Sequence, residues 1–189
     1  MKIVLVRHFD TDWNHQGRLQ GQTDISLNDI GRARAEMFVW QLAPLGIGRI
    51  VSSDMSRARE TAEIFGRRLG IPVLLDNRLR ECSFGKLEGM TVQEIEAKYG
   101  AGASAFTPRE YDFTKFGGES RDSVLSRHRA VISDEARRFF LYHRNGPRNV
   151  LLFIGHGNGL NTLLFHLGQE PNLKRGEYKM VELPGTPER

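Results

Sequence analysis

Two short apolar segments, each running into a loop that contains a histidine, constrain this chain more than any other feature. The first is 2–6 (KIVLV), followed by Arg7 and His8, and the second is 150–154 (VLLFI), followed two residues later by His156. Apolar runs of this length, bounded by polar residues or glycine, are typical of fully buried strands. In an open α/β sheet, ligands bind at the carboxyl ends of the strands. We therefore expect the two histidines to meet at one edge of a sheet.

Segments typical of helices and strands alternate along the chain. Further strands are predicted at 50–51, 72–75 and 178–183, and helices at 55–69, 91–99, 120–144 and 158–167. This order predicts one domain over residues 1–189, with the α/β fold of a three-layer α/β/α sandwich around a mostly parallel central sheet. The segment 100–118 is longer than most connections, so we expect a lid or substrate-recognition loop there.

A helix is also expected after the first polar loop. Ser26, with Asp29 three residues on, is similar to a capping box and predicts that the helix begins there. Pro44 and Gly46 predict where it ends. One apolar stripe is predicted along this helix, consisting of Ile30, Ala33, Met37 and Leu42.

The composition indicates a globular protein of ordinary type. Of the 189 residues, 39% are hydrophobic and 26% are charged, and Cys82 is the single cysteine, so no disulfide can form within the chain. A strand begins almost at the N-terminus, which leaves no room for a signal peptide, and no apolar stretch approaches the roughly 20 residues of a membrane span. We expect a cytoplasmic protein that has no membrane partner.

The net charge of +4 raises the question of nucleic-acid binding. The basic residues are, however, interleaved with acidic ones, as in SRARETAEIFGRRLG, and no aromatic-plus-basic RNA motif is present. We therefore predict no nucleic-acid partner and favour a basic pocket for a small anion. The sequence carries no indication of an oligomeric state.

The polar residues near the predicted strand ends suit phosphoryl transfer. They comprise two histidines, two arginines and a carboxylate, namely Arg7, His8, Arg57, Glu81 and His156. Arginine offers a permanently charged fork that matches phosphate oxygens. A neutral histidine is a competent nucleophile near pH 7, and a protonated histidine or carboxylic acid can protonate a leaving oxygen.

Metal binding is the main competing chemistry, because histidines and a carboxylate can hold zinc or iron. Arg7 beside His8 would repel a cation, and the HExxH spacing is absent. The Walker A and GxGxxG motifs are absent as well. We therefore predict no metal and no cofactor.

Several motifs resemble one known family. RHFDTDWN is similar to the RHGETxWN signature of the histidine phosphatase superfamily, also called the phosphoglycerate mutase-like family. GRLQGQTDISLNDIGRARA is similar to its GxxQGxxDxPLxxxGxxQA pattern. SSDMSRARETAEIF, LRECSFGKLEGM, GGES and VLLFIGHGNGLNTLL continue the resemblance in the family's order, and together these motifs cover most of the chain.

The resemblance implies a phosphoglycerate mutase-like fold and a role for each matching residue. His8 would be the nucleophile that becomes phosphohistidine, and Glu81 would donate a proton and then act as base for water. The other matching residues would hold the phosphoryl group (Arg7, Arg57, His156, Asn14 and the N–H of Gly157) or contact the rest of the substrate (Gln20 and Gly21).

Three positions depart from the family pattern: Phe9 replaces a glycine, Asp10 a glutamate and Gly155 a serine. Phe9 is expected either to crowd the loop or to shape the substrate pocket. Asp10 is expected to organise the loop.

The expected function is that of a metal-independent phosphomonoesterase, a phosphoric monoester hydrolase acting on a small phosphorylated metabolite. The mutases that this chain resembles are typically longer, and LQGQTD and LRECSFGKLEG look more like the phosphatase branch. Phosphoryl transfer of the phosphoglycerate mutase type remains an alternative. A catalytically weak protein that binds a phosphorylated ligand on the same fold is another, and Phe9 is its best support.

Overall fold

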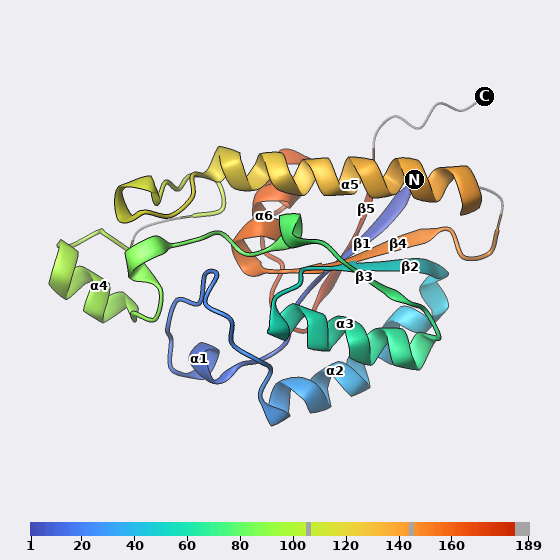
Figure 1. Cartoon of the computed structure of the whole chain (residues 1–189), viewed down its shortest axis with the longest axis horizontal. Coiled ribbons are helices and arrows are strands. Elements are labelled where there is room, and N and C mark those ends of the chain that lie inside the picture. Colours follow the sequence, from blue (N-terminus) through green and yellow to red (C-terminus); the bar gives the residue numbers. More distant parts are fainter. Residues whose placement is uncertain (105–106, 144–145, 184–189) are drawn as a thin grey trace.

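A computed structural model describes residues 1–104, 107–143 and 146–183. The described chain forms one five-stranded sheet in the order β3-β2-β4-β1-β5 (Figure 1). Three of the four strand pairs are parallel, and β5 pairs antiparallel with β1 at one edge. The strands are β1 (Lys2–Arg7), β2 (Ile47–Ser52), β3 (Val73–Leu75), β4 (Val150–Gly155) and β5 (Tyr178–Glu182). The predicted mostly parallel sheet is confirmed.

Helices cover both faces of this sheet, which makes the three predicted layers (Figure 1). The α-helices are α1 (Asp12–His15), α2 (Asp29–Leu42), α3 (Ser56–Leu69), α4 (Val92–Tyr99), α5 (Arg121–His143) and α6 (Gly157–His166). Short 3-10 turns lie at Ala43–Leu45, Asn77–Leu79, Gly85–Leu87 and Thr114–Phe116.

The alternation of side chains along β1 divides the core into two parts. Val4 and Val6 pack into the cluster formed with α2 and α3, whereas Ile3 and Leu5 pack into the cluster formed with α5 and α6. Successive side chains of a strand point to opposite faces, so a strand buried on both faces must be apolar throughout. This requirement explains the continuous apolar run that the sequence shows.

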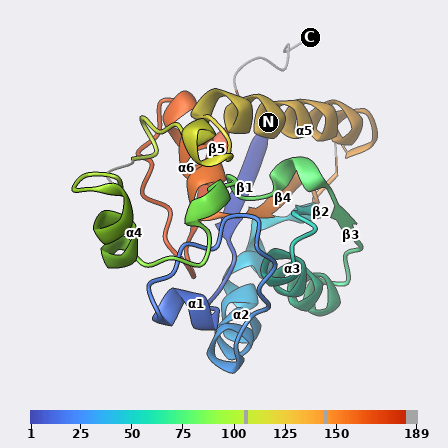
Figure 2. The same cartoon turned by 60° about the vertical axis from the view of Figure 1, so that its left-hand side comes forward.

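The carboxyl ends of β1, β2 and β4 lie side by side. The N–H of His8 donates to the carbonyl of Gly155 at 3.0 Å, and the N–H of Ser53 donates to the carbonyl of Ile154 at 3.0 Å. Figures 1 and 2 show α1 and α4 on the side of the molecule toward which β1 ends. The residues that follow these strands are therefore gathered at one edge of the sheet, as predicted.

The described part of the segment 100–118 packs against a separate aromatic cluster. Tyr111, Phe113 and Phe116 are buried there with Phe84, and the Phe84 and Phe113 rings meet edge to face with centroids 4.9 Å apart. Buried aromatic side chains anchor this part of the loop to the body of the protein. The lid role stays a prediction.

The start and the apolar face of α2 differ from the sequence-based expectation. The N-cap is Asn28 and not Ser26, because the Asn28 Oδ1 accepts the N–H of Gly31 at 2.8 Å. The predicted stripe was also wrong, since Ile30 and Met37 are 56% and 75% exposed. The buried side of α2 consists of Gly31, Ala35, Phe38, Val39 and Leu42.

Tight contact with the loop after β1 decides which face of α2 is buried. A Cβ on Gly31 would lie 2.2 Å from the carbonyl oxygen of Asp10, so only glycine allows this approach. Gly31 must therefore face inward, and this orientation leaves Ile30 and Met37 in solvent.

Phe9 lies in the core and not in a pocket. Its side chain is 1% exposed, and its ring meets those of Phe38 and Phe65 at centroid distances of 5.4 and 6.1 Å. Because the side chain points between α2 and α3, it fills space beneath the loop that follows β1. The expectation that Phe9 shapes the substrate pocket is therefore wrong, and the expectation that it crowds the loop stays a prediction.

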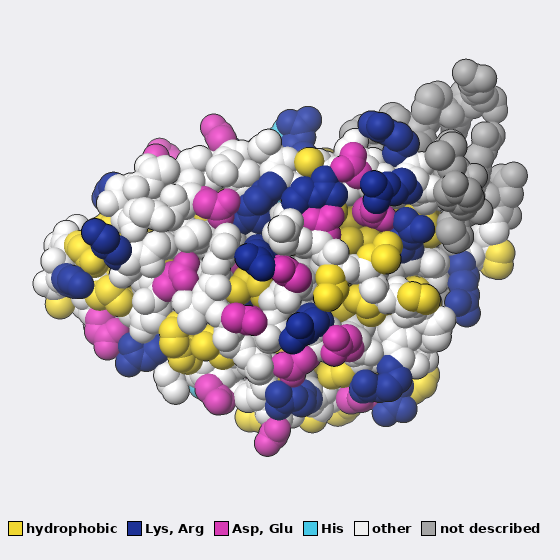
Figure 3. Space-filling view, in the orientation of Figure 1, with side chains coloured by type: hydrophobic (Ala, Val, Ile, Leu, Met, Phe, Trp, Pro, Cys, Tyr) yellow, Lys and Arg dark blue, Asp and Glu magenta, His cyan; other side chains and the backbone are white. Residues whose placement is uncertain are grey.

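The surface carries both charge signs close together. Figure 3 shows Lys and Arg side chains interspersed with Asp and Glu on the face in view. Surface ion pairs include Arg68 with Glu36 and Arg80 with Asp54. No helix in the described ranges is both long enough and apolar enough to cross a membrane.

The position of the α2 cap can be tested by two alanine substitutions. We expect Asn28→Ala to lower the free energy of unfolding by about 1 kcal/mol, because the N–H of Gly31 loses its acceptor. Ser26→Ala should change it by no more than about 0.5 kcal/mol. Urea denaturation followed by circular dichroism measures both, and a larger loss for Ser26→Ala would contradict the cap described here.

Candidate active site

A cavity of about 160 Å³ opens where the strands end. It is lined by Arg7, His8, Asn14, Arg18, Leu19, Gln20, Gly21, Arg57, Glu81, Phe84, Gly157, Asn158 and Asn161. Of the candidate residues predicted from the sequence, only His156 is missing from this lining, and it lies directly behind His8 with the two ring centroids 5.2 Å apart. The structure thus brings all nine candidates together.

His8 is held as a neutral imidazole with one nitrogen available. Its Nδ1 lies 2.7 Å from the carbonyl oxygen of Phe9, so Nδ1 carries the proton and donates it. Burial lowers the pKa of His8 well below its usual value, and the charges of Arg57 and Arg7 lower it further. The lone pair is therefore on Nε2, as a nucleophile requires.

Arg7 is a half-buried charged residue whose Nε donor is buried and unused in the described structure. Burial lowers the pKa of Arg7, and its Nε is buried without a hydrogen-bond partner among the described residues. The backbone of Gly157 approaches closely, since a Cβ there would lie 2.8 Å from Arg7 Cζ. A buried N–H without an acceptor is costly, so this donor fits the oxygen of an anionic ligand.

Arg57, at the start of α3, connects the site to the loop after β1. Its Nη2 donates to the carbonyl of Gly21 at 2.7 Å and its Nη1 to the carbonyl of Thr23 at 3.0 Å. Burial lowers the pKa of Arg57 to about 10, so the group remains charged at neutral pH. Gly21 has φ +54°, and a Cβ there would collide with Glu88, so glycine is required at this position.

Both ring nitrogens of His156 have partners within the protein. Nδ1 accepts from Arg57 Nε at 3.2 Å, so Nε2 carries the proton and donates to Ser53 Oγ at 2.9 Å. Burial, together with the charge of Arg57, lowers the pKa of His156 well below its usual value. In this arrangement His156 orients Arg57, and its contact with a phosphoryl group stays a prediction.

Glu81 lies against the first turn of α6. Its Oε1 accepts the N–H groups of Cys82 at 2.9 Å and Gly159 at 3.1 Å, and its Oε2 accepts that of Asn158 at 3.1 Å. Glu88 instead organises loops, because it accepts from Gln22, Thr23, Ser83 and Phe84. Glu81 lines the cavity, whereas Glu88 is not among its lining residues.

The remaining predicted residues lie on the loop after β1. Asn14 Oδ1 accepts from the N–H and Oγ1 of Thr11, which caps α1. Gln20 Oε1 is buried without a partner in the described structure, as is Asn158 Nδ2. One free acceptor and one free donor beside the same cavity suit a ligand that carries hydroxyl groups.

Asp10 and Cys82 stabilise the structure around the site and do not belong to the proposed chemistry. Asp10 is buried and pairs with Arg34 and with Arg175, the latter at 3.1 Å, so it organises the loop as expected. Cys82 is also buried, and this burial raises the pKa of its thiol. A thiol that stays protonated is a poor nucleophile and a poor redox centre.

Sequence reasoning missed several residues of the cavity and its support: Arg18, Leu19, Ser53, Phe84, Asn158 and Asn161. All six lie within segments that match the family motifs, so membership of these motifs was the available indication. No role was assigned to any of them from the sequence.

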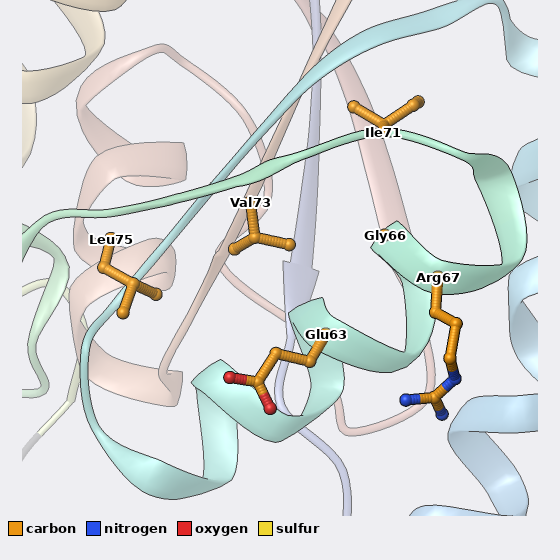
Figure 4. A pocket seen from close by; sticks show the side chains of 6 residues that line it. All are labelled: Glu63, Gly66, Arg67, Ile71, Val73 and Leu75. Carbon is orange, nitrogen blue, oxygen red and sulfur yellow. The ribbon is translucent and has the colours of Figure 1, made fainter.

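A second hollow, of about 300 Å³, lies between α3 and β3 and is lined by Glu63, Gly66, Arg67, Ile71, Val73 and Leu75 (Figure 4). It contains neither a histidine nor any of the predicted site residues. The smaller cavity at the strand ends is therefore the candidate active site.

Comparison with known proteins identifies the family. A profile of the histidine phosphatase superfamily (branch 1) matches residues 3–182. The chain belongs to the histidine phosphatase superfamily. This membership confirms the predicted family, the predicted fold class and the predicted enzyme class of phosphatase.

Relatives in this superfamily carry two kinds of name. Glucosyl-3-phosphoglycerate phosphatase of Mycolicibacterium vanbaalenii is 35% identical over 162 residues, which are 86% of this chain and 72% of that protein. Probable phosphoglycerate mutase GpmB of Erwinia tasmaniensis is 32% identical, over 93% of this chain and 79% of that protein. Among solved structures, mycobacterial glucosyl-3-phosphoglycerate phosphatase Rv2419c with VO3 has a TM-score of 0.84 at 30% identity, covering 96% of this chain and 90% of that one.

Buried neutral histidines make the stability of this histidine phosphatase depend on pH. Burial lowers the pKa of His128 from 6.5 to about 3, and it lowers those of His8 and His156 as well. Below pH 6.5 the unfolded chain binds protons that the folded chain does not, so stability is lost as the pH falls. From about pH 7 to about pH 5 we expect His128 to contribute a loss of about 2 kcal/mol, and the lowered pKa values of His8 and His156 add to the loss in the same direction.

Urea denaturation at the two pH values measures this loss. His128→Leu should make the loss smaller by about 2 kcal/mol, whereas His15→Gln, at an exposed position, should leave it unchanged. An equal pH dependence in wild type and His128→Leu would contradict the pKa shift.

The contact between Gly157 and Arg7 generates a prediction for anion binding. We expect Gly157→Ala to weaken binding of inorganic phosphate by about tenfold or more, because the new methyl group displaces the Arg7 guanidinium. Gly155→Ala is the matched control, since its Cβ would meet the Leu160 side chain at 3.3 Å. Isothermal titration calorimetry compares the variants, and equal affinities would contradict the role of this contact.

Proposed function

We propose that this protein is a metal-independent phosphomonoesterase that hydrolyses a small phosphorylated metabolite through a phosphohistidine on His8. The observation that carries the proposal is the neutral His8, with its lone pair on Nε2, in a cavity that is also lined by the half-buried Arg7 and the buried Arg57. A nucleophile beside fixed cations is what attack on a phosphate dianion needs.

In the first step the Nε2 lone pair of His8 attacks phosphorus while the ester P–O bond breaks. Arg7 and Arg57 stabilise the charge on the equatorial oxygens, as preorganised donors do in phosphoryl transfer. His156 holds Arg57 in place through Nδ1, and the N–H of Gly157 and the side chain of Asn14 provide further donors. Gln20 and Gly21 border the part of the cavity proposed for the leaving group.

Glu81 supplies the proton to the leaving oxygen. Its Oε1 already accepts two N–H groups, whereas Oε2 accepts one, so Oε2 is the oxygen with room for a proton. In the second step water attacks phosphorus, Glu81 takes a proton from that water, and the P–N bond breaks to release phosphate. The positive charges of this site come from side chains, so the proposed steps need no metal ion.

Several features support a small, hydroxyl-bearing substrate. The cavity volume is about 160 Å³, and Gln20 Oε1 and Asn158 Nδ2 are an acceptor and a donor without partners in the described structure. Two solved structures of one relative, Rv2419c, carry the name glucosyl-3-phosphoglycerate phosphatase, and that substrate name combines a sugar with a phosphate ester. We propose phosphorylated sugars or polyols as the substrate class, handled inside the cell without a nucleic-acid partner.

A mutase is the second candidate, because relatives named as probable phosphoglycerate mutases match this chain. Both reactions begin with phosphohistidine and differ in whether water or a second hydroxyl accepts the phosphoryl group. Incubation with each phosphoglycerate isomer in turn distinguishes them, since a mutase interconverts the isomers whereas a phosphatase releases phosphate.

The decisive assay measures hydrolysis of p-nitrophenyl phosphate in the presence of EDTA. We expect wild-type turnover to persist, and His8→Ala to lower it by about a thousandfold or more, because no other side chain replaces Nε2. Turnover equal in the two proteins would favour a protein that only binds phosphorylated ligands. Turnover abolished by EDTA and restored by a divalent metal would contradict a metal-independent reaction.

Covalent labelling tests the intermediate itself. The reaction with substrate is stopped without acid, because phosphohistidine is acid-labile. We expect mass spectrometry to find a phosphoryl adduct on His8 in wild type. The side chain of Phe9 has no role in the proposed reaction, so Phe9→Leu, the control, should retain the adduct. Persistence of an acid-labile adduct in His8→Ala would identify a different nucleophile.

A further inference from the structure

Arg127, on α5, uses all five of its N–H donors within the protein. Its Nη1 donates to the carbonyls of Arg78 at 2.9 Å and Arg80 at 2.5 Å, and its Nη2 donates to the carbonyl of Glu81 at 2.8 Å. The other two bonds, each 2.9 Å long, go from Nε and Nη2 to the carboxylate of Glu119. This guanidinium therefore fixes the backbone of the segment that carries Glu81.

Glu119 fixes the same segment on the other side of Glu81. Its Oε2 accepts the N–H of Ser83 at 2.9 Å and Gln22 Nε2 at 3.3 Å. Gln22 Nε2 also donates to the carbonyl of Glu81 at 3.2 Å. The backbone is thus fixed both before and after Glu81, and the loop that contributes Gln20 is tied to it.

The next residue of α5 supports the opposite wall of the Glu81 site. His128 is fully buried, and a Cβ on Gly159 would lie 2.3 Å from its Nε2, so the imidazole packs directly against the first turn of α6. That turn provides the N–H groups of Asn158 and Gly159 to the Glu81 carboxylate. Consecutive residues of α5 therefore fix both elements between which this carboxylate lies.

We propose that Arg127, acting through Glu119 and the carbonyls around Glu81, is a positioning residue for the proton transfer to the leaving group. Arg127 is not among the residues that line the cavity, and the hydrogen bonds described above connect it to Glu119 and to the backbone that ends at Glu81. Its contacts converge on Glu81 alone among the residues of the proposed mechanism. The inference rests on the proposed function, because it concerns the proton that Glu81 transfers.

A proton-transfer role depends on the leaving group. Alkyl phosphates need protonation of the departing oxygen, whereas p-nitrophenolate leaves without it. We expect Arg127→Lys, which keeps a charge but loses the fork, to lower kcat/KM for β-glycerol phosphate by about thirtyfold and that for p-nitrophenyl phosphate by at most about threefold. Arg138→Lys is the matched control, because this arginine lies on α5 with its side chain 66% exposed and pairs with Glu135.

A double-variant cycle separates positioning of Glu81 from general loss of stability. In a Glu81→Gln background, Arg127→Lys should leave the ratio of the two kcat/KM values unchanged within about twofold, since there is no carboxyl group left to position. The proposal would be overturned if Arg127→Lys changed this ratio as much in the Glu81→Gln background as it does in wild type. Equal slowing of both esters by Arg127→Lys alone would also overturn it.

Glu119→Gln provides a second route should Arg127→Lys fail to fold, as judged by circular dichroism. It retains the shape of the side chain while weakening both bonds to Arg127, and the same change in ratio is expected. Loss of folded structure in both variants would overturn the inference, because the pair would then serve stability. If wild type hydrolyses neither ester, the proposed function fails too, whereas wild-type activity with an unchanged ratio in the variants rejects the positioning role alone.

Discussion

The site depends on one buried positive charge. Arg57 places a guanidinium group among two imidazoles and a second arginine, with water excluded, where an unpaired charge is costly. Carbonyls of residues 21 and 23 and the Nδ1 of His156 accept its hydrogen bonds. These acceptors come from the loop after β1 and the end of β4, so α3, the sheet and the loop must assemble together before the charge is accommodated. Burial lowers the pKa values of both imidazoles and the Arg57 charge lowers them further, which links the assembly of the fold to the reactivity of His8.

Most of the fold could be predicted from the sequence, because the strands are buried on both faces. An apolar run such as Val4 to Val6 has no other stable place than the centre of a sheet covered by two layers. Where such runs end, polar residues must emerge at the same edge, which is why His8 and His156 meet. Arg57 and Glu81 stood out for the same reason, and the family motifs then supplied the remaining members of the site, which are Asn14, Gln20, Gly21 and Gly157.

The errors have a common physical origin in contacts between distant segments. Ile30 and Met37 have the spacing of a buried helix face. The close approach of Gly31 to the Asp10 carbonyl, however, orients α2 so that both side chains are exposed to solvent. Phe9 stands beside the nucleophile in sequence, but side chains alternate in direction along an extended chain, and its ring went into the core. Arg127 lies on a helix rich in arginine, and the residues next to it in the sequence do not distinguish it from an exposed arginine such as Arg138. Each outcome was decided by a partner remote in the chain.

The hydrogen bond from His8 Nδ1 to the carbonyl of Phe9 has a consequence for the lifetime of the proposed intermediate. Once phosphorus is attached to Nε2, the ring bears a positive charge, and the carbonyl dipole favours keeping the Nδ1 proton in place. When the P–N bond of this cationic ring breaks, neutral imidazole departs, and it is a far better leaving group than the imidazolate anion that a ring without the Nδ1 proton would release. The main chain of the residue that replaces the family's glycine thus helps ensure that the modified enzyme discharges to water and does not persist as an inert adduct.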